Sequence, residues 1–161
     1  MNNFDSIYKL YFDKVFRLCK GYFNGDIDVA SDASQEVFIK VWGNLSNFRN
    51  ESNVSTWIYR IASNTCLMYL RKQSNKKEIQ VKEFPEMVTE SDANQIEENL
   101  KKMYSCISQL DPTNKLIIMM VLEDLPYKEI AIIIGISEEN VRVRIHRIKS
   151  NLTKCVQNGK V

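Results

Sequence analysis

Residues 125–152, LPYKEIAIIIGISEENVRVRIHRIKSNL, decide the fold of the carboxy-terminal part of this chain. Two apolar helical patterns are separated by Gly135, a residue that readily takes the left-handed conformation that ends a helix. Ser137 follows and can act as an N-cap, while Glu138 and Glu139 favour the positive end of a helix dipole. We therefore predict a short helix before Gly135 and a longer one after Ser137.

The longer helix has one apolar face and one cationic face. Its apolar residues recur at the spacing of a single helical face: Val141, Ile145, Ile148 and Leu152. The outer side carries Arg142, Val143, Arg144, His146, Arg147 and Lys149. Cations alone also fit a solvated surface helix, but the glycine turn and the preceding short helix favour a helix-turn-helix that enters the major groove of DNA. Arginine can pair with guanine and Val143 could meet a thymine methyl, whereas we expect His146 to contact the groove without any catalytic part.

Composition indicates an ordinary soluble protein whose charge is unevenly distributed. The chain has 161 residues, with 44% hydrophobic and 26% charged residues and a formal net charge of +2. This is enough for one domain or two small ones. Residues 57–77 hold five cations and no acid, whereas residues 73–99 hold seven acids against three lysines. Two basic surfaces separated by an acidic connector are therefore expected.

Membrane, metal and enzymatic classes receive no support from the sequence. No apolar run is long enough to cross a membrane and no signal peptide precedes the first helix, so we expect a cytoplasmic protein without stable membrane insertion. Cys19, Cys66, Cys106 and Cys155 are widely spaced, and His146 is the single histidine. We expect four reduced thiols, no metal site and no cofactor.

The predicted fold class is all-α, with two small helical domains joined by a linker, the second containing the helix-turn-helix. Helical patterns cover residues 4–18, 28–45 and 56–72, with an ordered loop over 44–55. Residues 73–94 lose periodicity and are predicted to be the linker.

The second domain begins near residue 95 with a further amphipathic pattern. The residues expected to point inward on this helix are Ile96, Leu100, Met103, Ile107 and Leu110. Asp111 and Pro112 then begin another helix, since proline is well suited to a first helical turn. Its LIIMMVL run should form the core of the second domain.

Several motifs resemble the extracytoplasmic-function (group IV) sigma factors of bacterial RNA polymerase. In the first half these are DASQEVFIKVW, TWIYRIASN and YLRK; in the second half they are LDP, YKEIA, GIS and VRVRIHR. The resemblance covers nearly the whole chain except the connector. It implies a sigma factor, not an enzyme, that binds core RNA polymerase and directs promoter-specific initiation. Residues 1–72 would read the −10 element, 73–94 form an acidic linker, and 95–157 read the −35 element.

The resemblance also assigns residues in the first domain. Those implied to dock on polymerase are Asp32, Gln35, Glu36, Ile39 and Lys40. Those implied to read and melt the −10 element are Phe48, Arg49, Asn50, Ser52, Thr56, Trp57, Tyr59, Arg60, Arg71 and Lys72, with Lys76 and Lys77 adding phosphate contacts. Unstacked bases need aromatic platforms, polar edges and cations, which this segment offers. By its apolar surroundings Trp57 also fits the core, so we expect it to be partly buried.

Three departures from the family pattern are present. Met68 stands where many members have an acidic residue. Pro126 replaces a frequent serine, although Asp124 could cap the following helix instead. Glu139 and Asn140 stand where Gly-Thr is common, and an acid there is unfavourable beside DNA phosphates.

Other functions remain open at this point. A stand-alone DNA-binding regulator would use the carboxy-terminal helices without polymerase, and a protein-interaction module would have lost DNA activity. An enzyme is disfavoured because no phosphate loop or nucleophile–base pair is present. The resemblance further implies an anti-sigma factor as a partner.

Overall fold

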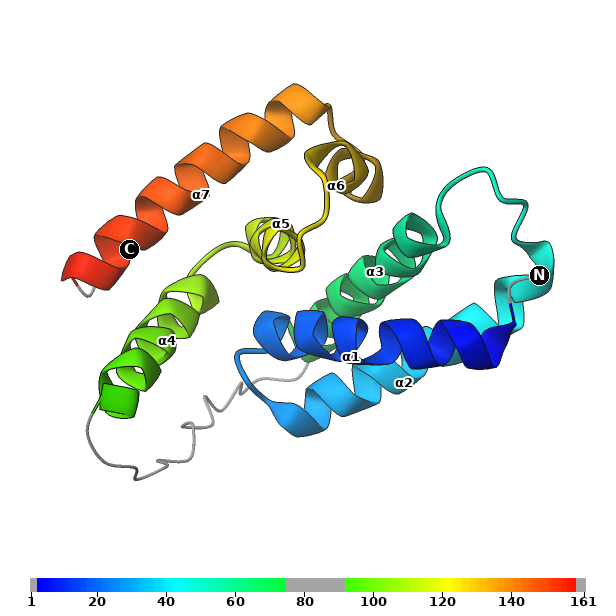
Figure 1. Ribbon diagram of the computed structural model, residues 1–161, viewed down its shortest axis with the longest axis horizontal. Helices are drawn as coiled ribbons and strands as arrows, with labels where there is room; N and C mark the ends of the chain where they lie inside the picture. Colours follow the sequence, from blue (N-terminus) through cyan, green and yellow to red (C-terminus); the bar gives the residue numbers. More distant parts are fainter. Residues whose placement is uncertain (1–2, 75–91, 159–161) are drawn as a thin grey trace.

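The computed structural model describes residues 3–74 and 92–158, which form α-helices and one 3-10 turn without strands, confirming the all-α class (Figure 1). The first group comprises α1 (Phe4–Tyr22), α2 (Ile27–Asn44), the 3-10 turn η1 (Leu45–Asn47) and α3 (Val54–Ser74). The second group comprises α4 (Asp92–Ser108), α5 (Pro112–Leu122), α6 (Tyr127–Ile134) and α7 (Glu138–Asn158). Most of the linker expected over 73–94 lies outside the described residues, and its described ends are helical.

Helices α1, α2 and α3 form a three-helix unit whose buried faces follow the sequence pattern. Asp26 caps α2 by accepting a hydrogen bond from the Val29 amide at 3.2 Å, which fixes where that helix begins. Val15 and Leu18 of α1 meet Val37 of α2 in a core from which water is excluded. Helix α3 packs against both α1 and α2. In this arrangement Ile39 and Trp42 of α2 remain 70% and 67% exposed.

The second unit forms around α5, as its composition predicted. Asp111 caps this helix by accepting from the Asn114 amide at 2.9 Å, with Pro112 in the first turn. All residues from Leu116 to Met120 are buried. The strongly apolar helix is therefore the centre of its unit rather than a surface helix.

The turn between α6 and α7 has the predicted chemistry. Gly135 has φ +84°, a left-handed conformation that ends α6. The Ser137 hydroxyl accepts a hydrogen bond from the Asn140 amide at 3.1 Å and so caps α7. The prediction that Asp124 caps α6 is wrong. Pro126 occupies the N-cap position without a side-chain bond, because Asp124 itself takes a left-handed φ of 58° two residues earlier.

Helix α4 departs from its prediction. Ile107 is buried, but Ile96 and Leu100 are 66% and 47% exposed, because this end of the helix extends beyond its packing partners. The expectation of four reduced thiols is also wrong. Packing of α4 against α7 brings Cys106 and Cys155 together in a disulfide with a Cα–Cα distance of 6.0 Å. Cys19 and Cys66 remain buried thiols.

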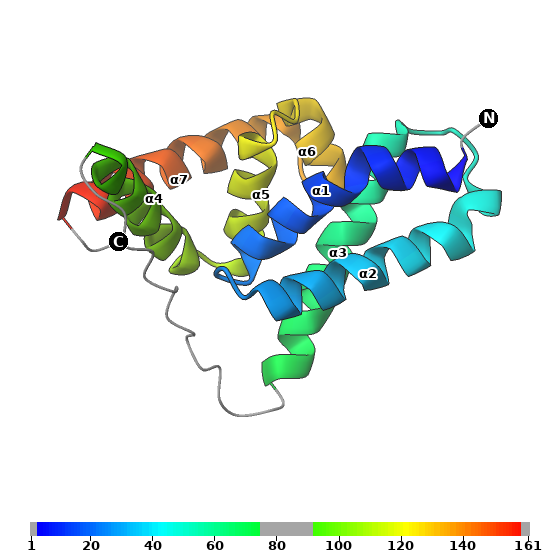
Figure 2. The ribbon, with the colours of Figure 1, turned by 60° about the horizontal axis from the view of Figure 1, so that its bottom comes forward.

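The two units pack on each other through α1 against α5 and α3 against α6 (Figures 1 and 2). Arg17 of α1 donates two hydrogen bonds to the Glu123 carboxylate at the end of α5, at 2.7 and 3.0 Å. Gly21 allows close approach, since a Cβ there would collide with the Met119 side chain of α5. The buried core continues from one unit to the other.

Candidate functional site

The outer face of α7 is a cationic surface that faces away from the core. The predicted contacts Arg142, His146, Arg147 and Lys149 are exposed, and Val143 is 44% exposed among them. The apolar residues predicted to lie beneath are all buried: Val141, Ile145, Ile148 and Leu152. We call Arg142, Val143, Arg144, His146, Arg147 and Lys149 the recognition face.

Two arginines of the recognition face form hydrogen bonds within the protein. Arg142 donates to Glu138 at 2.8 Å, an exposed i,i+4 pair that contributes only about 0.3–0.5 kcal/mol and can be exchanged for a phosphate. Arg144 is half-buried and its Nη1 lies 3.4 Å from the Asn114 Oδ1 of α5. Arg147 and Lys149 therefore present freer charges than Arg144 does.

Residues 47–60, which we call the aromatic loop segment, contain most of the predicted −10 contacts. Arg49, Asn50 and Ser52 are exposed, and Asn50 takes a left-handed φ of 56°. Phe48 and Trp57 lie with ring centroids 4.7 Å apart at an interplanar angle of 30°, both half-buried as expected for Trp57. This pair offers one partly open apolar platform flanked by polar side chains.

Two predicted members of this segment lie inside the fold. Thr56 is 3% and Tyr59 is 1% exposed. Burial is the main cause that raises the pKa of Tyr59, and the nearby Glu123 carboxylate acts in the same direction. In this closed arrangement neither side chain is exposed, and only Thr56 borders the cavity described below.

The aromatic loop segment is tied to the first helix of the helix-turn-helix. Arg60 donates to the Ile132 carbonyl at 2.9 Å, and Asn53 donates to the Glu129 carboxylate at 2.9 Å. A cavity of about 680 Å³ lies between the two units at this point. It is lined by Asn47, Phe48, Arg49, Glu51, Ser52, Asn53, Thr56, Trp57, Arg60, Lys128, Glu129 and Ile132.

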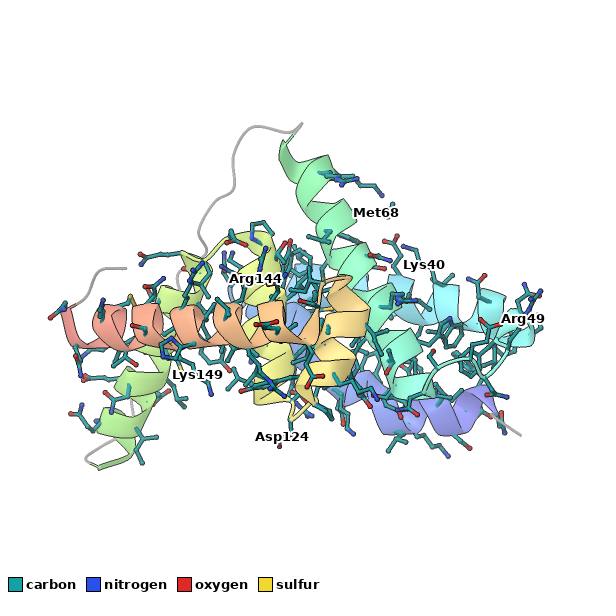
Figure 3. The ribbon with its side chains drawn as sticks, turned by 90° about the horizontal axis from the view of Figure 1, so that it is seen from above. Lys40, Arg49, Met68, Asp124, Arg144 and Lys149 are labelled. Carbon is teal, nitrogen blue, oxygen red and sulfur yellow. A yellow bond between two sulfur atoms is a disulfide. The ribbon has the colours of Figure 1, made fainter. Side chains whose placement is uncertain are left out.

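Figure 3 separates the two predicted DNA-contacting regions: Arg49 lies at one end of the molecule and Lys149 lies along α7, away from it. The remaining predicted cations, Arg71 and Lys72, lie exposed in the last turns of α3, beyond the exposed Met68. Lys76 and Lys77 lie outside the described residues. The basic surfaces of the chain are thus distributed over α3, the aromatic loop segment and α7.

The outer side of α2 combines polar residues with a large apolar area. Asp32 and Gln35 are at least partly exposed, and Ile39 is 70% exposed. Lys40 lies 3.3 Å from Glu36 and also donates to the Thr65 hydroxyl of α3 at 3.1 Å. These residues belong to one continuous surface, in which the charges of Glu36 and Lys40 are largely paired with each other.

Trp42 was missed by sequence reasoning. It is 67% exposed and, with Ile39, borders a shallow hollow whose other lining residues are Phe4, Tyr8, Gln35 and Phe38. Its ring meets that of Phe4 edge-on at 4.9 Å. The signal was available in the sequence, because Trp42 stands three residues after Ile39 and outside the buried stripe of α2. An exposed tryptophan beside an exposed isoleucine is characteristic of a docking surface.

Other chemistry is sparse in the described part of the chain. No cluster of His, Cys, Asp or Glu residues there could hold a metal ion. Among the helices of residues 3–74 and 92–158, none combines the length and apolar character needed to span a bilayer. The described residues thus present two notable surfaces, the cationic face of α7 and the exposed apolar area on α2.

Comparison with known proteins gives the family. The family model for Sigma-70 region 2 matches residues 7–76, and that for Sigma-70, region 4 matches residues 100–152. The ECF RNA polymerase sigma-E factor of Escherichia coli (strain K12) is 31% identical over 161 residues, covering 91% of this chain and 83% of that protein. The ECF RNA polymerase sigma factor SigW of Bacillus subtilis (strain 168) is 27% identical over 174 residues, covering 96% and 89%. The chain belongs to the extracytoplasmic-function sigma factors.

Solved structures agree with this fold. The sigma factor RpoE in complex with the anti-sigma factor NepR from Bartonella quintana has a TM-score of 0.76 at 17% identity, covering 96% of this chain and 97% of that one. CnrH in complex with the cytosolic domain of CnrY has a TM-score of 0.70 at 18% identity, covering 96% and 87%. Its membership of the family, shown by the two family models and the relatives above, makes the chain a sigma factor that directs RNA polymerase to promoters and not an enzyme.

Proposed function

We propose that residues 1–72 dock on core RNA polymerase and read the −10 element, that 73–94 act as an acidic linker, and that 95–157 read the −35 element. The docking contacts are Asp32, Gln35, Glu36, Ile39 and Lys40, to which we add Trp42. The −10 contacts are Phe48, Arg49, Asn50, Ser52, Trp57, Arg60, Arg71 and Lys72, with Thr56 and Tyr59 supporting them from within the fold.

One observation carries this proposal: Ile39 and Trp42 form an exposed apolar surface on α2, remote in sequence from the helix-turn-helix. A stand-alone DNA-binding regulator needs no such surface beside its cationic helix. Burying the apolar area of these two side chains supplies association energy, and the surrounding Asp32 and Gln35 supply polar contacts at the rim.

Promoter recognition uses the two basic regions differently. The recognition face enters the major groove, where Arg147 pairs with a base edge and Lys149 contacts phosphate. The Phe48–Trp57 platform stacks on an unpaired base, and Arg49 and Arg60 neutralise nearby phosphates. Arg60 must first leave the Ile132 carbonyl, so the two units separate when polymerase and promoter bind.

The same separation provides a point of control. An anti-sigma partner that keeps the units together leaves the aromatic loop segment closed, which is consistent with the compact arrangement of residues 3–74 and 92–158. We also place the protein in the cytoplasm, where RNA polymerase and promoter DNA are found.

The test is retention of the protein on immobilised bacterial core RNA polymerase. Ile39→Asp should weaken retention by about tenfold or more, because a carboxylate is then desolvated in an apolar contact. Ile27→Asp is the matched control: Ile27 is 57% exposed on the same helix, at its N-terminus. Equal retention of both variants, or no retention of the wild-type protein, would count against the proposal.

A further inference from the structure

The disulfide between Cys106 and Cys155 joins two helices with different roles. Cys106 lies on α4, and Cys155 lies on α7 beyond the recognition face. Both side chains are almost fully buried, at 4% and 1% exposure. The bond closes a loop with a sequence separation of 49, which contains α5 and α6 and therefore most of the second unit.

Helix α4 has few buried apolar residues besides the cysteine of this bond. Cys106 and Ile107 are its only fully buried apolar residues in the described part of the chain, and Ile96 and Leu100 face solvent. Its main packing partner is α7, along whose C-terminal end it lies (Figures 1 and 2). A helix held by so little buried area is sensitive to the loss of a covalent tie.

A surface hollow adjoins the disulfide. Both cysteines line a surface hollow of about 300 Å³, together with Lys102, Ser105, Gln109 and Val156. Lys102, which is exposed, stands four residues before Cys106 on α4 and borders the same hollow. A buried cystine without such an opening would be inert to small thiols.

The other cysteine pair provides an internal contrast. Cys19 and Cys66 lie with Sγ atoms 3.8 Å apart, one on α1 and the other on α3, and both are 0% exposed. The hydrogen bond between the two thiols, together with burial, raises the pKa of Cys66, and the same hydrogen bond lowers the pKa of Cys19. The three surface hollows described above, on the aromatic loop segment, α2 and α4, include neither of these cysteines.

We propose that Cys106 and Cys155 form a reversible dithiol–disulfide site that switches α4 between a covalently and a noncovalently held state on the recognition helix. Oxidation proceeds by exchange with a small-molecule disulfide. The Cys106 thiolate attacks one sulfur of that disulfide and releases one small thiol, and the Cys155 thiolate then attacks Cys106 Sγ and releases the second. Two protein thiols lose two electrons and two protons, and the small disulfide is reduced to two thiols.

The proposed site rests on the proposed function in one respect: a sigma factor works in the cytoplasm, which is a reducing compartment. Disulfides that form in such surroundings are characteristically transient and regulatory rather than structural. Reduction leaves α4 held on α7 by noncovalent packing alone.

The experiment is a titration of the full chain with reduced and oxidised dithiothreitol, with acid quenching, alkylation in denaturant and mass measurement. The wild-type protein should change from two to four alkyl groups as the buffer becomes reducing, without denaturant present during equilibration. Cys19→Ser/Cys66→Ser should change from none to two, and Cys106→Ser/Cys155→Ser should keep two throughout. The oxidised wild-type form should also melt more than about 5 °C above the reduced form.

Four alkyl groups at every buffer ratio would overturn the proposal, since the bond would not form. Reduction only after denaturation would overturn it as well, because the bond would then be structural. Thiol counting does not involve polymerase or DNA, so its outcome is independent of the docking and promoter contacts proposed above.

Discussion

Gly135 sets the geometry of the helix-turn-helix through its backbone alone. Its φ of +84° is unfavourable for residues with a Cβ, although no atom obstructs a Cβ at this position. Gly135→Ala should therefore lower the free energy of unfolding by about 1 kcal/mol, through backbone strain and not through a clash. Urea unfolding followed by circular dichroism measures this.

Gly43, a glycine without a positive φ, serves as the control for Gly135. It lies exposed in α2, where a Cβ would also meet open space, but its φ is not positive. Gly43→Ala should raise the free energy of unfolding by about 0.5–1 kcal/mol because alanine restricts the unfolded chain. Equal effects of the two substitutions would contradict the role assigned to Gly135.

Tyr22 links stability to pH. Burial raises its pKa from 10.0 to about 12, with the nearby Cys66 adding to the shift, and its hydroxyl has no hydrogen-bond partner among the described residues. The unfolded state thus releases this proton more readily than the folded state does. The contribution of this pKa difference to the free energy of unfolding is fully present below pH 10, and it is lost as pH rises from 10 through 12.

Tyr22→Phe should accordingly reduce the alkaline loss of stability. We expect the variant to lose on the order of 2 kcal/mol less than wild type between pH 10 and 12. At pH 7 it should be at least as stable, because an unsatisfied buried hydroxyl is removed. Tyr8→Phe, at a tyrosine that is 40% exposed on the same helix, should follow the wild-type curve in urea unfolding.

Helix α7 allows a direct comparison of two cations on one element. Arg147→Ala should weaken binding to a duplex selected by the wild-type protein by about tenfold, since an arginine–base pair contributes roughly 1–3 kcal/mol. Fluorescence anisotropy at fixed salt measures the change. Lys154→Ala removes the same charge from the same exposed helix, beyond the recognition face, and should weaken binding far less. Equal losses of DNA affinity in the two variants would mean that binding depends only on the net charge of α7.

The success of sequence reasoning differed between elements for a physical reason. The turn at Gly135 and the caps at Ser137 and Asp111 depend on residues within one helical turn of each other, so their pattern was sufficient. For α4, periodicity correctly identified a face but could not indicate whether a partner covers Ile96 and Leu100. The prediction of a cap at Asp124 was wrong because this residue has a left-handed φ and lies before the N-cap position.

Contacts between residues far apart in the chain could not be predicted from the sequence. The Cys106–Cys155 bond arises from packing of α4 on α7, and cysteine spacing alone does not encode that packing. The same holds for Arg17 with Glu123, which are 106 residues apart. At the candidate site, the exposed positions of the recognition face and of α2 followed from helical periodicity, whereas the burial of Thr56 and Tyr59 was not predicted.

The closed arrangement of the two units predicts an opening variant. Arg17 forms a two-bond pair with Glu123, whose side chain is 11% exposed, and this pairing raises the pKa of the Arg17 guanidinium further. Arg17→Glu places two carboxylates together at the contact between α1 and α5. We expect the units to separate, which raises the radius of gyration above the roughly 15 Å of a compact chain of this length.

Small-angle scattering measures that change, and Lys9→Glu is its control. Lys9 is exposed on the same helix, so the charge change is identical but remote from α5. An unchanged radius for Arg17→Glu would show that the remaining contacts, including Met119 against Gly21 and the hydrogen bond from Arg60 to Ile132, are enough to hold the units together.

The central claim is that this chain gives RNA polymerase its promoter specificity, and it is tested most directly by transcription in vitro. Core RNA polymerase and a library of random promoter sequences are combined with and without the protein, and the transcripts are sequenced. The account predicts protein-dependent initiation from templates that share two separated sequence blocks, lost with Ile39→Asp and retained with Ile27→Asp. Sequence-specific binding of the protein to DNA without any protein-dependent initiation would contradict it.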